Sequence, residues 1–407
     1  MKPYSEYKDS GVKWIGEIPG HWECRKLKFL TSSMQSGDNL TAIQIKEIGK
    51  YPVYGGNGIR GYYDDSNCNK QCIVIGRQGA LCGNVHIVKK PFWATDHAVV
   101  TYANENTDLD FLFYLTKAMN LNQYASQTAA QPGIAVSAIK NIYTCYPPLP
   151  EQEAIVTYLD SKVAKIDEYI SIAEKKIAAL EELKQTIIAE AVTRGIHKDV
   201  PMKDSGVKWI GMIPEHWKRL RYKDVLRIRD EKVGKRKDLT LLSLSKKGVI
   251  IRDLIDGKGK FPKDFESYKI VTPNNLILCL FDVDETPRTV GIAKNTGMIT
   301  GAYDIFDVIN ENIKFIYYHY QSIDDVKGFK PLYKGLRKVI PLPSLMGSYI
   351  FIPSLEEQQE IVTYIEAKVA NINQLCQAER SQIEKLKEYK QRLISDVVTG
   401  KVKVTND

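Results

Sequence analysis

The chain has 407 residues, of which 43% are hydrophobic and 26% are charged, and its formal net charge is +8 at pH 7. This composition is typical of a globular protein of two or three domains, and no apolar run approaches the roughly 18 residues that span a bilayer. The N-terminal sequence lacks the apolar core of a signal peptide, and the seven cysteines show no framework spacing, so we expect a reduced, cytoplasmic chain and not a secreted, disulfide-rich one.

The first element along the chain, DSGVKWIGEIPGHW from Asp9 to Trp22, occurs again as DSGVKWIGMIPEHW from Asp204 to Trp217, with 12 of 14 positions identical. A repeat of this quality decides the architecture before any motif is interpreted. We call these two stretches the frame segments. They contain four of the five tryptophans, which we interpret as anchors in the core or at a docking surface: Trp14, Trp22, Trp209 and Trp217.

After the first frame segment, short apolar runs such as QCIVIG and HAVVTY are separated by Gly, Asn and Asp, and LDFLFYLTKAMN has a helical pattern. These patterns predict irregular sheets with a few helices. GNGIRG at residues 56–61 satisfies G-x-G-x-x-G, but a dinucleotide loop must lead from a strand into a helix, and a polar turn sequence follows here. We therefore interpret it as a glycine-rich loop that allows close approach of the backbone.

Cys68, Cys72, Cys82 and His86 have spacings that resemble a zinc site, C-x3-C and C-x3-H. Cys72 opens an apolar strand, however, and Cys82 lies in GALCGN. Buried small residues are the favoured interpretation.

A long helix is predicted from residue 151 to 194, because apolar residues recur at alternating steps of four and three, the seam of a coiled coil. EQEAIVTYLDSKVAKID from Glu151 is echoed by EQQEIVTYIEAKVANIN from Glu357, and a lysine interrupts each seam, at Lys184 and Lys390. Proline-rich sequences precede both helices, and Gly195 and Gly400 can end them. Helices of this length must pair, and each is the natural partner of the other.

The second intervening segment, between the second frame segment and the second long helix, is 11 residues longer than the first and shows no obvious similarity to it. Residues 23–150 contain 12 Lys and Arg against 9 Asp and Glu, and residues 218–352 contain 25 against 16. Positive charge is thus concentrated in the two globular segments, which favours a polyanionic partner. Asp282, Asp284 and Glu285 could hold a metal, but an exposed acidic turn is the favoured interpretation.

The sequence contains no phosphate-binding loop, no H-E-x-x-H motif and no Asn/Asp-Pro-Pro-aromatic motif of amino-methyltransferases. No catalytic residues and no metal ligands are predicted.

Together these residues resemble the specificity subunit of type I restriction-modification enzymes. The resemblance covers nearly the whole chain and rests on the frame segments, on PLPEQEAIVTYLD and AVTRGI at the ends of the first helix, and on their second copies. YPVYGGNGIRGYYDD, GRQGALCGNV, FWATDHAVV and QPGIAVSAIKNI look like one class of target-recognition domain, and LLSLSKKGVIIRD and GAYDIFDVI look like another.

The resemblance implies an α+β fold in which two globular target-recognition domains are joined by two long helices that form an antiparallel coiled coil, with an internal pseudo-twofold repeat. The expected boundaries are residues 1–150 for the first recognition domain, 151–194 for the first helix, 195–203 for a linker, 204–355 for the second recognition domain, 356–400 for the second helix and 401–407 for a C-terminal tail.

The resemblance also implies a non-catalytic subunit that recognises an asymmetric, bipartite site in double-stranded DNA. Two modification subunits would bind the frame segments and supply S-adenosylmethionine and adenine methylation, and restriction subunits would add the ATP-driven motor and nuclease. No cofactor is expected in this chain, because S-adenosylmethionine, ATP and Mg belong to the partner subunits.

Direct readout of bases favours Arg or Lys on guanine and Asn or Gln on adenine. We predict DNA contacts from Asn57, Arg60, Arg77 and Gln78 in the first recognition domain and from Lys246, Lys247, Arg288, Lys334 and Arg337 in the second, and we predict partner binding by the four frame tryptophans. Two alternatives remain open. A free-standing methyltransferase or nuclease is opposed by the missing motifs, and a coiled-coil adaptor that binds protein would not be retained on DNA at moderate salt.

Overall fold

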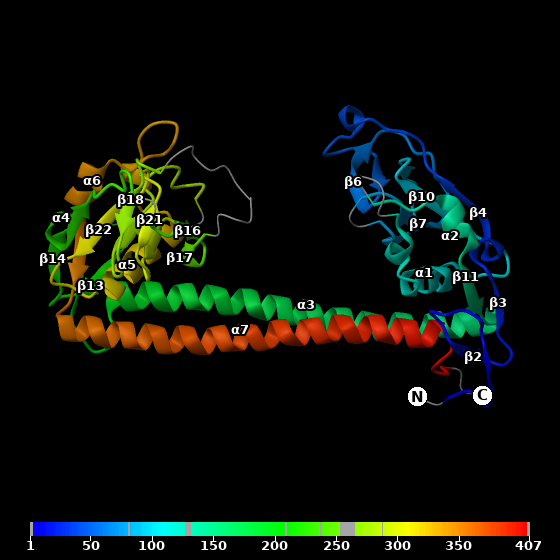
Figure 1. Ribbon diagram of the computed structural model, residues 1–407. Helices are drawn as coiled ribbons and strands as arrows, with labels where there is room; N and C mark the ends of the chain where they lie inside the picture. The colour runs from blue at the N-terminus through cyan, green and yellow to red at the C-terminus, as the bar shows by residue number, and fades with distance from the viewer. Residues whose placement is uncertain are drawn as a thin grey trace. The chain divides into compact units, whose positions relative to one another are not determined.

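The computed structural model describes residues 3–79, 82–126, 132–207, 210–236, 238–252, 265–286 and 288–404. The chain folds as two compact units, unit 1 with Met1–Ala173 and Arg380–Asp407, and unit 2 with Glu174–Glu379. Two long helices, α3 (Leu149–Arg194) and α7 (Leu355–Val398), contribute residues to both units (Figure 1).

Unit 1 is built on a four-stranded antiparallel sheet of order β4-β10-β7-β8, with a three-stranded sheet β6-β5-β9 and the two-stranded pairs β1–β2 and β3–β11. Its elements before α3 are β1 (Tyr7–Asp9), β2 (Glu17–Pro19), β3 (Glu23–Lys26), η1 (Leu27–Leu30), β4 (Thr31–Ser36), η2 (Ala42–Gln44), β5 (Tyr51–Gly55), β6 (Gly58–Tyr63), β7 (Cys72–Gly76), β8 (Val85–Val88), β9 (Trp93–Ala94), β10 (Ala98–Ala103), α1 (Leu109–Ala118), η3 (Leu121–Tyr124), α2 (Val136–Asn141) and β11 (Tyr143–Tyr146).

Unit 2 is built on a four-stranded antiparallel sheet of order β15-β22-β19-β20, with the two-stranded pairs β12–β13, β14–β23, β16–β17 and β18–β21. Its elements between the long helices are β12 (Met202–Asp204), β13 (Met212–Pro214), β14 (Lys218–Arg221), α4 (Tyr222–Val225), β15 (Leu226–Arg229), β16 (Leu242–Ser245), β17 (Gly248–Ile251), β18 (Lys269–Val271), β19 (Leu276–Leu278), β20 (Val290–Ile292), β21 (Gly297–Ile299), β22 (Asp304–Val308), α5 (Ile313–Asp325), η4 (Lys330–Leu332), α6 (Leu342–Gly347) and β23 (Tyr349–Ile352).

The two units share one plan although their intervening sequences show no obvious similarity. Both four-stranded sheets have the same strand order. If the strands of each sheet are numbered along the chain, the order across the sheet is 1-4-2-3. In each unit the strand after the frame segment also pairs with the strand before the long helix, as β3–β11 and β14–β23. The sequence predicted mixed segments but not this common topology, because strand order is set by contacts between distant residues.

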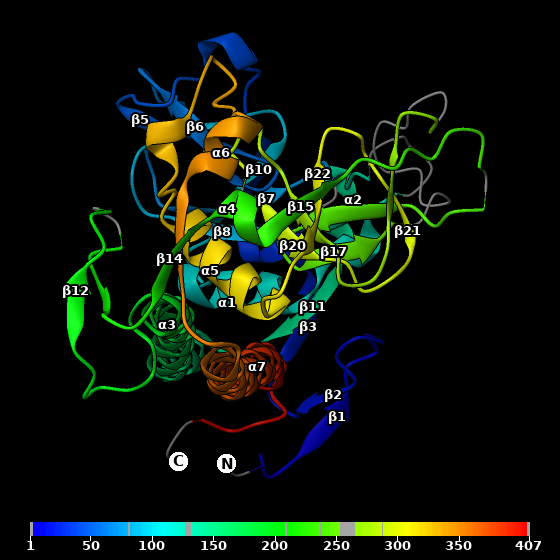
Figure 2. The same ribbon diagram turned by 90° about the vertical axis from the view of Figure 1, so that its left-hand side faces the viewer.

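One amphipathic helix joins each sheet to the long helices. The side chain of Asp108 caps α1 by accepting a hydrogen bond from the Phe111 amide at 2.8 Å, and Asn312 caps α5 by accepting from the Lys314 amide at 2.9 Å. In unit 2, α5 lies between the sheet and the long helices (Figure 2), and its buried Phe315 packs in one core with residues of β20, β22, α3 and α7.

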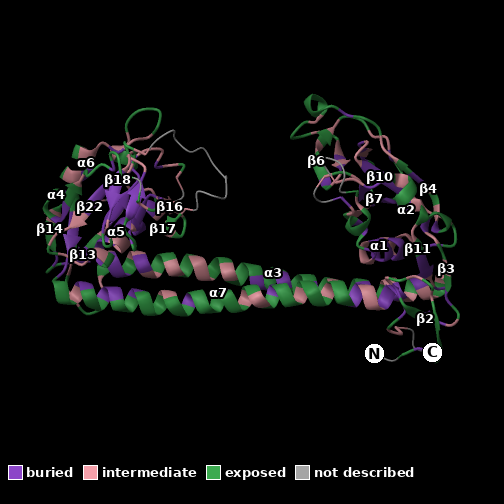
Figure 3. Cartoon of the chain, in the orientation of Figure 1, coloured by how far each residue is buried: buried purple, intermediate pink, exposed green. Residues whose placement is uncertain are grey.

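The long helices run antiparallel and pack along the predicted seam. Seam residues such as Leu159, Ile170, Ile365 and Ile383 are buried (Figure 3). The two seam lysines make equivalent polar contacts, since Lys390 donates to both carboxylate oxygens of Asp167 at 2.6 Å within unit 1, and Lys184 lies 3.5 Å from the Asn373 amide oxygen within unit 2. The predicted coiled coil with its pseudo-twofold repeat is confirmed.

Each long helix ends at a glycine that lies against a frame segment. Gly195 and Gly400 have φ values of 73° and 76°, in the left-handed region that favours glycine at the end of a helix. A Cβ on Gly400 would lie 2.4 Å from Cδ of Pro19 and 3.2 Å from the Trp22 ring, so only glycine fits there. A Cβ on Gly195 would lie 3.6 Å from the Trp217 ring, so this glycine is required by its backbone conformation.

A glutamate in the first turn of each long helix holds the frame segment. Glu151 accepts hydrogen bonds from Tyr4 Oη at 2.6 Å and Trp22 Nε1 at 3.3 Å, and it lies 2.7 Å from His21 Nε2. In unit 2, the Glu357 side chain repeats the tryptophan and histidine contacts, with Trp217 Nε1 at 3.1 Å and His216 Nε2 at 2.8 Å.

The following glutamine holds the rest of the unit. Gln152 is fully buried; its Oε1 accepts from the amide of Asp108, the residue that caps α1, at 2.9 Å, and its Nε2 donates to the Pro147 carbonyl at 2.9 Å. Gln358 is equally buried and makes the same two bonds, from the Asn312 amide at 2.9 Å and to the Pro353 carbonyl at 3.1 Å.

The expectation of a fully reduced chain is not met. Cys24 on β3 and Cys145 on β11 form a disulfide, and they are direct partners in the antiparallel register. Their separation of 121 residues hid this proximity, because it arises only when the first and last strands of the segment pair. The equivalent pair in unit 2 is Arg219 opposite Phe351, so the covalent link is specific to unit 1.

None of the helices in the described ranges is both long enough and apolar enough to span a bilayer.

Replacing Gln152 or Gln358 by Ala should lower the free energy of unfolding by about 1–3 kcal/mol each, because a buried amide and a buried carbonyl lose their partner. Calorimetric melting of the full chain measures this. Gln185→Ala, on the exposed face of α3, is the matched control and should leave the melting temperature unchanged or slightly raised. Equal effects at all three positions would contradict the role assigned to the buried glutamines.

Protein purified without reductant and then denatured should expose five reactive thiols, and seven after reduction, because five cysteines are free in the structure. In the chain-entropy account, a closed loop of this length contributes roughly 4–5 kcal/mol, so reduction should lower the stability of unit 1 and not that of unit 2. Seven thiols before reduction would show that the pair is not oxidised.

Candidate nucleic-acid interface

Polar side chains converge where the β5–β6 hairpin of unit 1 meets the turn between β7 and β8. Asn57, exposed at the hairpin tip, accepts a hydrogen bond from Asn84 Nδ2 at 2.5 Å. The hairpin also lies against His86, since a Cβ on Gly58 would lie 3.3 Å from the imidazole. The pair of amides therefore fixes the direction of an exposed hydrogen-bonding group.

Glycines in this hairpin and at the end of β7 allow a very close approach of the two backbones. A Cβ on Gly56 would lie 2.6 Å from the carbonyl oxygen of Gln78, and one on Gly76 would lie 1.7 Å from the carbonyl oxygen of Gly56. The predicted role of GNGIRG as a close-approach loop is confirmed. The motif spans a turn between two antiparallel strands, which is not the strand-to-helix geometry of a dinucleotide loop.

Arg77 and Gln78 lie directly beside this hairpin. Arg77 Nη1 donates to Ser36 Oγ at 2.9 Å, and its backbone is held by the His97 carbonyl at 3.0 Å and the Ile134 amide at 2.9 Å. Gln78 is exposed. The close packing of Gly56 against Gln78 thus brings three predicted residues of unit 1 together, namely Asn57, Arg77 and Gln78. Arg60 is exposed on strand β6, and its side chain runs along Gly55.

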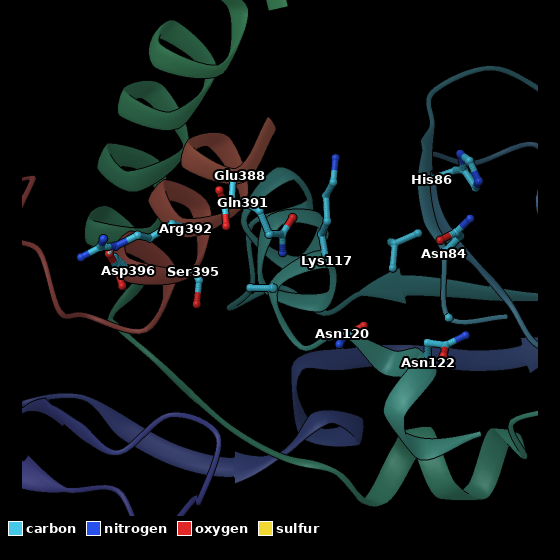
Figure 4. A pocket seen from close by; sticks show the side chains of 13 residues that line it. Asn84, His86, Lys117, Asn120, Asn122, Glu388, Gln391, Arg392, Ser395 and Asp396 are labelled. Atoms are coloured by element: carbon cyan, nitrogen blue, oxygen red, sulfur yellow. Dashed lines mark hydrogen bonds and ion pairs between the residues drawn. The ribbon is translucent and has the colours of Figure 1, made fainter. Parts of the chain in front are cut away.

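A cavity of about 910 Å³ continues from Asn84 and His86 to the C-terminal part of α7 (Figure 4). Its polar lining mixes amides, cations and carboxylates: Asn84, His86, Lys117, Asn120, Asn122, Glu388, Gln391, Arg392, Ser395 and Asp396. Because acids accompany the bases, the cavity offers hydrogen-bond partners without a uniform positive field.

Burial shifts the pKa values of two basic side chains in the cavity wall, His86 and Lys117. Desolvation lowers the pKa of His86, and the nearby Lys117 lowers it further, so the imidazole is neutral at pH 7. Desolvation also lowers the pKa of Lys117, with repulsion from Lys390 in the same direction and Asp167 opposing it. The sequence did not single out Asn84 or Lys117. The β7–β8 pairing places Asn84 beside the hairpin, and the packing of α1 on β8 places Lys117 in the cavity wall.

In unit 2 the predicted residues lie in three different settings. Lys246 and Lys247 are exposed in the turn between β16 and β17, where the Ser245 hydroxyl accepts from the Lys247 amide at 3.1 Å. Lys334 and Arg337 lie on an exposed turn at residues 334–339.

Arg288 is largely enclosed. Its Nη1 lies 3.0 Å from Asp325 Oδ1, with side-chain exposures of 17% and 13%, although the geometry is not that of a hydrogen bond. Burial raises the pKa of Asp325 more than Arg288 lowers it. This setting gives Arg288 a role inside unit 2 and leaves little of its guanidinium to meet a ligand.

The two residue sets that resembled metal sites are a group of buried cysteines and an acidic turn whose carboxylates bind basic side chains. Cys68, Cys72 and Cys82 are buried and free, and burial raises the pKa of Cys72 to about 12. Hydrogen bonding to Arg337 lowers the pKa of Asp282, and bonding to Lys338 lowers that of Asp284. Within the described residues, no group of three or more His, Cys, Asp or Glu could hold a metal ion.

The frame tryptophans differ in accessibility. Trp22 and Trp217 are 0% and 2% exposed, so in this structure they are core anchors with little surface for a partner. Trp14 is half-buried and donates to the Tyr143 carbonyl at 3.3 Å. Trp209 lies outside the described residues.

Comparison with known proteins gives consistent matches. Residues 19–182 match the family model described as the type I restriction modification DNA specificity domain. Over 164 residues the chain is 39% identical to the type I restriction enzyme EcoprrI specificity subunit of Escherichia coli, a match that spans 39% of this chain and 40% of that one. It is 25% identical to the putative type I restriction enzyme MjaX specificity subunit of Methanocaldococcus jannaschii over 98% of both chains.

A solved structure described as "Structural basis underlying complex assembly and conformational transition of the type I R-M system" contains a chain with the same fold. The TM-score is 0.67 at 15% identity, and the match covers 95% of this chain and 99% of that chain.

Arg288→Ala should destabilise unit 2 by about 3 kcal/mol, because it leaves the buried Asp325 carboxylate without its cation. Lys247→Ala, on an exposed turn, should leave stability unchanged and weaken retention on DNA at a fixed salt concentration. Thermal melting and fluorescence anisotropy with labelled duplex measure the two effects separately. A stable Arg288→Ala variant that loses DNA binding would reverse this assignment.

Proposed function

We propose that the chain is a DNA specificity subunit of a type I restriction-modification system, which recognises an asymmetric, bipartite DNA site and directs adenine methylation and ATP-dependent cleavage by partner subunits at that site; the match of residues 19–182 to the specificity-domain model and the similarity to specificity subunits support this. Specificity subunits of this family are the non-catalytic, DNA-binding components. The observation that carries the proposal is the use of one sheet topology twice, with different loop sequences on each copy.

Each recognition domain, at residues 1–150 and 204–355, would read one half of the site. In unit 1, the Asn57–Asn84 amide pair and the exposed Gln78 suit hydrogen bonding to adenine, and Arg60 and Arg77 suit guanine or phosphate. In unit 2, cations on the two exposed turns would take these roles: Lys246, Lys247, Lys334 and Arg337. Arg288 is assigned to the fold of unit 2 and not to base readout.

The partners would be two modification subunits, one on each frame segment, together with restriction subunits. The frame occurs twice with the same Trp, His and Glu contacts, and this equivalence supports two identical docking sites. S-adenosylmethionine, ATP and Mg would be bound by those partners, in the cytoplasm.

Exchanging residues 23–146 for the equivalent segment of a relative should change one half-site and leave the other half-site and the gap unchanged. The exchange is structurally favourable, because its two ends, Glu23 and Tyr146, are neighbours in the β3–β11 register. Methylome sequencing of a host that expresses the exchanged chain with its modification gene gives the answer. Independent reading by the two units would be excluded by a change in both halves.

A further inference from the structure

The turn at residues 334–339 in unit 2 carries an apolar side chain at its tip. Leu336 is 103% exposed, more than any other large hydrophobic residue in the part of the chain that the structure describes. It lies in the sequence KGLRK, between Lys334 and Arg337. A leucine at such a position contributes nothing to the core and leaves its whole apolar surface in water.

The turn that holds Leu336 is firmly anchored. Lys334 and Val339 exchange two backbone hydrogen bonds, at 2.8 and 3.0 Å, and the Arg337 carbonyl accepts from the Asp282 amide at 2.8 Å. The Arg337 guanidinium binds both carboxylate oxygens of Asp282, at 3.2 and 2.6 Å, and lies over the Phe281 ring at 5.2 Å.

The next residue adds a further anchor, because Lys338 Nζ donates to Asp284 at 2.8 Å. The turn therefore presents its leucine on a support with several independent attachments.

DNA offers an aliphatic side chain two kinds of contact. One is the thymine methyl group in the major groove, and the other is the faces of two base pairs at an opened step. Parting a stacked step requires a rigid support, because a flexible loop would yield before the bases did. The anchoring of this turn favours the second contact.

We propose that Leu336 is an apolar wedge that enters one base step of the half-site read by unit 2 and opens it. The proposal rests on the proposed function and adds a specificity determinant that acts through DNA deformation and not through hydrogen bonds. The net positive charge of the segment that carries the turn favours DNA over a protein partner, since residues 218–352 contain 25 Lys and Arg against 16 Asp and Glu.

The test uses the full chain assembled with its modification subunits and duplexes that carry 2-aminopurine at successive positions of that half-site. Unstacking raises 2-aminopurine fluorescence. We expect a rise at one step other than the methylated adenine, its loss in Leu336→Ala, and its retention in Leu336→Met. We also expect Leu336→Ala to weaken DNA binding about tenfold, as the burial of one leucine would predict.

Val326→Ala is the matched control, because Val326 is 63% exposed in the same unit but lies at the end of α5. It should change neither fluorescence nor affinity. The signal at the methylated adenine, where extrusion of the target base is expected, should persist in all variants and reports that the proposed function is intact.

Three results would overturn the wedge. One is the absence of any step whose fluorescence depends on Leu336. Another is a loss of affinity when thymine is replaced by uracil, combined with no fluorescence sign of unstacking. This result would indicate that Leu336 contacts the thymine methyl group. The third is weaker assembly with the partner subunits, which would make Leu336 a protein contact. If the wild-type complex bound no site at all, the proposed function would fail and the wedge with it.

Discussion

The first turn of each long helix carries a Glu-Gln pair on which the arrangement of each unit depends. The glutamate binds the frame segment through tryptophan and histidine, and the glutamine binds the amide of the residue that caps the helix beneath the recognition sheet. Both glutamines are fully buried, where an unpaired amide would be costly. Two adjacent side chains therefore hold both the frame segment and the four-stranded sheet of each unit at one end of the long helix.

This arrangement explains why the frame is repeated and the intervening segments are free to differ. The two bonds that both glutamines share go to backbone groups, namely the cap amide and the proline carbonyl, and these bonds place no demand on the side chains of the loops. Gln358 adds one side-chain bond, to Glu311 at 2.6 Å. The sheets retain one strand order while their hairpins differ in length and charge. The loops of the sheets can thus change without disturbing the contacts that hold the sheets.

Features encoded by local periodicity were predictable, and features that depend on distant pairs were not. The seam of the long helices and their terminal glycines follow from helical spacing and from the need for positive φ, and both were found where predicted. The shared strand order pairs residues as distant as Ser36 with Val99 and Leu226 with Val308, and the Cys24–Cys145 link joins residues 121 positions apart, so local periodicity reveals neither. Arg288 shows the same limit, because a basic residue in a turn-like sequence reads as exposed until its partner, Asp325, is located.

The charge of unit 2 is less available to DNA than its count suggests. On the exposed turn of the predicted interface, Arg337 binds Asp282, and the neighbouring Lys338, which was not among the predicted residues, binds Asp284. These exposed pairs contribute little to folding stability, but they fix the side chains in one orientation. A phosphate that approached such a pair would have to compete with a carboxylate already in place. In the proposed function, unit 2 would therefore discriminate among DNA sites by shape and position more than it would hold DNA by charge.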